Sequence, residues 1–131
     1  MSYYMAATLG TSFDNAIERT EAALKTEGFG ILTRVDVQQT LKIKIDVDFR
    51  PYTILGACNP KLAHEALQLE DKVGTMLPCN VVVQQTGDGN VEVAAINPVA
   101  SMQSIDNPQL HKAAEAVRVK LARVIDSLAN P

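Results

Sequence analysis

The two cysteines of the chain are the residues best suited to chemistry. Cys58 directly precedes Asn59-Pro60, a pair typical of a helix start, and the free amides of a helix start favour a thiolate beside them. Cys79 follows Pro78 and opens an apolar run of valines. Packing as a small hydrophobic residue is the commoner role of a free cysteine, and it is the alternative for both.

The relation between the two thiols depends on how the strands that carry them pair. If these strands are antiparallel neighbours, the end of one lies beside the start of the other, and the thiols share one edge of the sheet. If the helix between them forms a parallel crossover, the thiols lie at opposite ends. The spacing of Cys58 and Cys79 matches neither a C-x-x-C redox motif nor a paired zinc knuckle.

Four nearby residues complete the predicted site, as ligand-binding residues beside the thiols. The amides of Asn59 and Asn80 line a polar pocket or simply shape turns, and Pro60 begins the helix. His64 lies one turn into that helix, as a base for Cys58, a metal ligand or an exposed residue. The methionines at positions 76 and 102 offer soft sulfur for copper, although methionine more often fills core gaps. No complete set of metal ligands is predicted.

Composition excludes several classes of protein. The 131 residues predict a single domain, 1–131, and the net charge of −3 without a basic face argues against a nucleic-acid partner. No segment is long and apolar enough to cross a membrane, and the N-terminal segment lacks the features of a signal peptide. A cytoplasmic location is expected, where two cysteines stay free. Motifs for nucleotide phosphate, dinucleotide or catalytic zinc are missing, so the cofactor, if any, is unknown.

Hydrophobic periodicity and cap residues predict five strands and four helices. The strands are Tyr3–Leu9, Phe29–Val35, Tyr52–Ala57, Asn80–Gln84 and Val91–Ile96. The helices are Phe13–Glu27, Asp36–Ile45, one from Pro60 to Gly74 and one starting at Pro108. The segment 36–45 also fits a strand, but the cap at Asp36 favours a helix. A turn containing Asp88-Gly89 joins the last two strands, and Asn97–Asp106 is expected to be a loop.

This order of elements indicates an α+β fold with a mainly antiparallel, five-stranded sheet and helices packed on one face. The opposite face is partly apolar, so we expect either short elements or a second subunit to cover it, and we predict a homodimer.

Three blocks carry a resemblance to a known family: Phe49–Tyr52, Ile54–Pro60 and Leu77–Val81. Here the chain resembles the domain-of-unknown-function family three hundred and two of bacteria and archaea. The resemblance implies a fold like that of the TATA-box-binding protein, with a curved antiparallel sheet and often a dimer. It implies no established activity, and the fold does not bring DNA binding with it.

Three functions remain open, and whether the protein is an enzyme is not decided. The first is a non-enzymatic ligand-binding or interaction module. The second is a sulfur-transfer or redox protein with Cys58 as nucleophile and Cys79 as resolving thiol. The third is a soft-metal binder that uses both cysteines.

Overall fold

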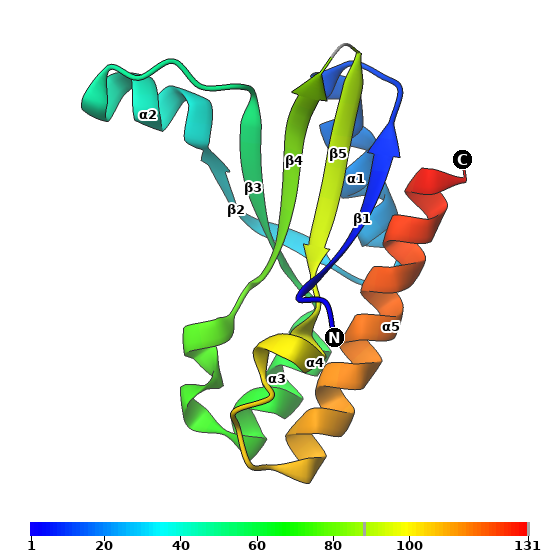
Figure 1. Cartoon of the computed structure of the whole chain (residues 1–131). Coiled ribbons are helices and arrows are strands. Elements are labelled where there is room, and N and C mark those ends of the chain that lie inside the picture. Colours follow the sequence, from blue (N-terminus) through cyan, green and yellow to red (C-terminus); the bar gives the residue numbers. More distant parts are fainter. Residues whose placement is uncertain (88, 131) are drawn as a thin grey trace.

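Five strands form one antiparallel sheet in the order β1-β5-β4-β3-β2 (Figure 1). The computed structural model describes residues 1–87 and 89–130. Every neighbouring pair of strands is antiparallel. The strands are β1 (Tyr4–Leu9), β2 (Gly30–Asp36), β3 (Tyr52–Cys58), β4 (Cys79–Gly87) and β5 (Asn90–Ile96).

The long helices lie on one face of this sheet, and the shorter ones gather at one of its ends or project from it (Figure 1). The helices are α1 (Phe13–Thr26), α2 (Val37–Ile45), α3 (Pro60–Leu69), α4 (Pro98–Ser101) and α5 (Pro108–Ala129), with a 3₁₀ helix η1 at Asp71–Met76. Helices α1 and α5 pack on the sheet and on each other. The predicted α+β class with helices on one face is therefore confirmed.

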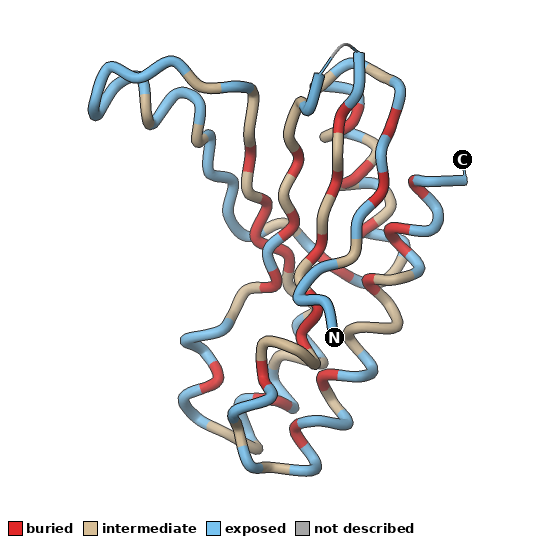
Figure 2. Tube along the Cα trace, viewed as in Figure 1, coloured by how far each residue is buried: buried red, intermediate tan, exposed pale blue. Residues whose placement is uncertain are grey.

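The main core lies between the sheet and these two helices. Side chains alternate along the strands, so one face supplies buried residues such as Leu55, Val81 and Val93. They pack with Leu24 of α1 and Leu121 of α5, both fully buried. Figure 2 shows buried positions separated mainly by partly buried ones along β4 and β5.

The segment with two competing predictions is a helix, α2. The Asp36 carboxylate accepts a hydrogen bond from the Gln39 amide at 2.9 Å, which is the predicted cap. Asp46 ends the helix in the left-handed region with φ 53°. No residue of α2 is buried, and the helix stands away from the sheet (Figure 2).

The sequence predicts that the helix beginning at Pro60 continues to Gly74, and that prediction is wrong. It ends at Leu69, Glu70 is extended with φ −152°, and η1 follows. The break turns the chain so that Val73 is buried in a second, smaller core with Leu110. The side chain of Asn107 donates a hydrogen bond to the Leu69 carbonyl at 3.1 Å, which satisfies the end of the helix.

The β4–β5 turn and the segment Asn97–Asp106 are the two remaining predicted connections. The β4–β5 hairpin is confirmed, with Gly87 paired to Asn90; Asp88 of the predicted turn lies outside the described residues. The expected loop Asn97–Asp106 contains the short helix α4. The Asn97 side chain caps it by accepting from the Val99 amide at 3.1 Å, an Asn-Pro start of the same kind as at α3 and α5.

Candidate functional site

The two thiols lie at the same edge of the sheet. Strands β3 and β4 are antiparallel, and Cys79, the first residue of β4, is paired with Ala57 of β3. Cys58 is the next residue after Ala57 and ends β3, so the cysteines are diagonal neighbours. Both are free thiols. Of the two arrangements left open by the sequence, the structure has the antiparallel one.

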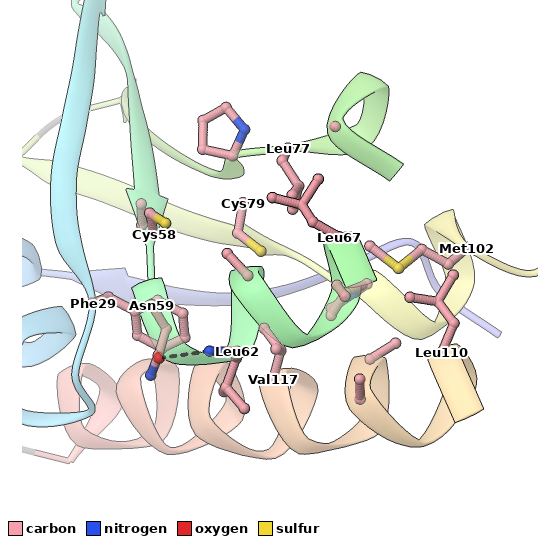
Figure 3. A pocket seen from close by; sticks show the side chains of 18 of the residues that line it. Phe29, Cys58, Asn59, Leu62, Leu67, Leu77, Cys79, Met102, Leu110 and Val117 are labelled. Atoms are coloured by element: carbon pink, nitrogen blue, oxygen red, sulfur yellow. Dashed lines mark hydrogen bonds between the residues drawn. The ribbon is translucent and has the colours of Figure 1, made fainter. Parts of the chain in front are cut away.

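A cavity of about 360 Å³ lies just beyond this edge (Figure 3). Its volume is in the range of small-molecule sites. It is bounded by the ends of β3 and β4, by α3 and η1, and by α4 and α5. The lining residues are Phe29, Leu32, Ala57, Cys58, Asn59, Leu62, Ala63, Ala66, Leu67, Gly74, Leu77, Pro78, Cys79, Pro98, Met102, Leu110, Ala113, Ala114 and Val117.

The lining is almost wholly apolar. None of the described residues that line the cavity is charged, and Asn59 is its one side-chain amide. Both ends of that amide are already engaged. Its oxygen accepts from the Leu62 amide at 3.3 Å, and its nitrogen donates to the Glu27 carbonyl at 3.4 Å. The amide therefore caps α3 and ties it to the end of α1, as the sequence allowed.

The thiols differ in their surroundings. Cys79 is 7% exposed, and its burial, followed by the proximity of Cys58, raises the pKa of its thiol from 9.0 to about 11. A thiol with this pKa is almost fully protonated at neutral pH, and it is a poor nucleophile there. Cys58 is half-buried at the strand end, directly before the N-terminus of α3.

The remaining predicted site residues divide into two groups. Asn59 lines the cavity beside both cysteines, whereas Pro60, His64 and Asn80 do not. His64 is exposed, with its ring 3.3 Å from the side-chain nitrogen of Gln68. Asn80 lies on the uncovered face of the sheet, in a separate shallow hollow.

The sulfur of Met102 lies in the cavity wall, whereas Met76 does not line it and is 36% exposed. Within residues 1–87 and 89–130, no three His, Cys, Asp or Glu side chains gather as metal ligands would.

Sequence reasoning missed most of the cavity wall. Helical periodicity alone predicts that apolar stripes such as those of α3 and α5 meet other side chains in a core. A signal was present in the small residues on both helices, Ala63 and Ala66 on α3 and Ala113 and Ala114 on α5. The two helices pack together, and their alanines leave space where larger side chains would have filled it.

These features define an α+β domain whose antiparallel sheet is covered by helices on one face and ends in an apolar cavity that holds two free thiols. None of the described helices is long and apolar enough to cross a membrane.

The family model described as "Domain of unknown function DUF302" matches residues 5–128, and the chain belongs to this family. The family suggested by the sequence is thereby confirmed. The crystal structure of an uncharacterized conserved protein, DUF302, from Bacillus stearothermophilus is similar, with 32% sequence identity and a TM-score of 0.89. The similarity covers 96% of this chain and 98% of that chain. A comparison with curated proteins finds no match.

Proposed function

We propose that the protein is a non-enzymatic binding module that holds a small apolar ligand in the cavity beside Cys58 and Cys79. One observation supports this most: a cavity of about 360 Å³ has no charged side chain among its described lining residues. Large apolar cavities are rare in close-packed proteins and lose contact energy while they are empty. A ligand of matching size restores those contacts. We place the protein in the cytoplasm, where both thiols stay free.

Binding of a small uncharged fluorescent dye, N-methyl-1-naphthylamine, tests this proposal. The half-buried Ala113 lines the cavity, so Ala113→Leu fills part of it and should weaken dye binding at least tenfold. Ala116→Leu on the same helix is the control, because Ala116 is exposed and outside the cavity. Thermal unfolding should show both variants folded. No dye binding to the unmodified protein, or equal binding to both variants, would contradict the proposal.

A thiol function is the second candidate, favoured by the presence of both cysteines in one cavity wall. Cys58 would be the nucleophile, because the raised pKa of Cys79 keeps that thiol protonated. The pH dependence of alkylation of each thiol tests this. If Cys58 serves as a nucleophile, it should be alkylated rapidly at neutral pH, whereas Cys79 should not. Equally slow alkylation of both thiols at neutral pH would contradict the thiol function, and the binding module would remain as the proposal.

We also propose that the protein forms a homodimer through the uncovered face of the sheet and α2. A row of apolar side chains, Ala6, Ala94, Val82 and Ile54, crosses that face through paired positions of four strands. None of them is fully buried. On α2, Ile43 is 70% exposed, and a helix this short is marginal in water without a partner surface.

A twofold dimer would let each copy offer the same surfaces to the other. Light scattering at micromolar concentration should give twice the mass of one chain. Ile43→Glu should shift the protein towards monomer. Ala22→Glu on α1, also exposed, should leave the dimer intact. A monomer mass for the unmodified protein would contradict this proposal.

A further inference from the structure

We infer that the ligand of the cavity is a single unbranched aliphatic chain of about ten to fourteen carbons, with its polar head group in solvent at the mouth. This rests on the proposed binding function and adds the chemical class of the ligand. The shape, the wall chemistry and the exposed lining residues each support one part of it.

The residues that line the cavity are spread along α5 (Figure 3). On α5 its lining runs from Leu110 to Val117, which spans about 10 Å at 1.5 Å per residue. In Figure 3, Met102 and Leu110 lie at one end and Phe29 and Cys58 at the other, with Val117 between them. The cavity therefore extends along α5, and an extended chain fits such a space better than a compact ring system.

The chemistry of the wall also favours an aliphatic chain. Phe29 is the one aromatic side chain among the described lining residues, so a flat ring would lack a pair of stacking surfaces. The alanines of α3 and α5 form smooth walls, and Met102 is a flexible thioether that adapts to a chain.

The volume sets the size of the ligand. An engineered apolar cavity of about 150 Å³ holds benzene, with six carbons. A cavity of about 360 Å³ is about 2.4 times larger, so it holds about fourteen carbons at the same density.

Three lining residues remain exposed and mark where the cavity opens to solvent. Leu32 is 65% exposed, Leu67 is 41% exposed, and Gly74 is also exposed. The pairing of β2 with β3 shifts between Ile31 and Thr33, so Leu32 has no partner in the register. Such irregularities redirect side chains at sites. Because none of the described lining residues is charged and the Asn59 amide is already bonded, a charged head group has no partner inside and must stay where the cavity opens to solvent.

Two soluble series with heads of opposite charge test the inference: n-alkanoates and n-alkyltrimethylammonium ions of six to sixteen carbons. Calorimetry is done below the micelle concentrations. Affinity should rise about fourfold per added methylene in both series and level off near fourteen carbons. Similar affinities for the two heads at equal chain length support a head in solvent. A difference of more than a hundredfold would overturn that placement.

The variants then locate the chain. Ala113→Leu should move the plateau to chains about three carbons shorter, because leucine adds three carbons inside the cavity, while Ala116→Leu should not move it. Bound dodecanoate should also slow alkylation of Cys58. Affinity independent of chain length, or naphthoate binding more tightly than decanoate, would overturn the inference. The proposed function would still stand if the dye binds and Ala113→Leu weakens dye binding. If neither the dye nor the alkyl chains bind, both the inference and the proposed function are contradicted.

Discussion

Gly56 lies in β3, two residues before Cys58, and its replacement by alanine should destabilise the protein. A Cβ added at Gly56 would overlap the Thr33 hydroxyl oxygen and lie 2.8 Å from Cγ of Pro78, against 3.4 Å or more in ordinary contacts. Overpacking of this kind costs about 1–3 kcal/mol, and the smaller entropy of unfolded alanine offsets about 0.4–1 kcal/mol. Gly56→Ala should therefore lower the free energy of unfolding by about 1–2 kcal/mol in urea denaturation.

Two comparisons make this prediction specific. Gly30→Ala, on neighbouring β2, is the control, because a Cβ there meets no atom within 4 Å and the stability should change by less than about 0.5 kcal/mol. In a Thr33→Ala background the hydroxyl is gone, so Gly56→Ala should cost about half as much, a coupling above about 0.5 kcal/mol. If Gly56→Ala leaves the free energy of unfolding unchanged, or lowers it equally in both backgrounds, then Thr33 and Pro78 do not lie as close to Gly56 as described.

Three further predictions concern the thiol edge, the cap and the core. The pKa of the Cys79 thiol is about 11 in the folded protein and 9.0 for an unperturbed thiol, so this thiol loses its proton at lower pH in the unfolded state. The free energy of unfolding should therefore fall between pH 9 and 11 by up to about 2.7 kcal/mol. A Cys79→Ser variant with the same dependence of stability on pH would contradict this. Asn59→Ala removes the bonds to Leu62 and Glu27 and should cost about 1–2 kcal/mol in urea denaturation, and a neutral result would refute the capping role. Leu55→Ala, fully buried, should cost about 2–5 kcal/mol by the same assay, and less than about 1 kcal/mol would contradict the core assignment.

Local pattern decided most of the secondary structure. Helix starts with a capping side chain, such as Asp36 and the Asn-Pro pair at Asn59, depend on hydrogen bonds within three residues and can be recognised in the sequence. The strands follow from alternation and β-branched residues. The break after Leu69 could not be read in this way, because it is stabilised by Asn107, distant in the chain, and by burial of Val73 beside Leu110.

The candidate site could likewise be predicted from the sequence only in part. The sequence by itself identified Cys58, Cys79 and Asn59 as residues at strand ends and a helix start. Only the tertiary structure decided that β3 and β4 are antiparallel neighbours, which brings both thiols to one edge. It also decided that the stripes of α3 and α5 enclose a cavity. Strand pairing and the space left between side chains depend on residues far apart in sequence, and the periodicity of one helix or strand does not record what lies opposite it.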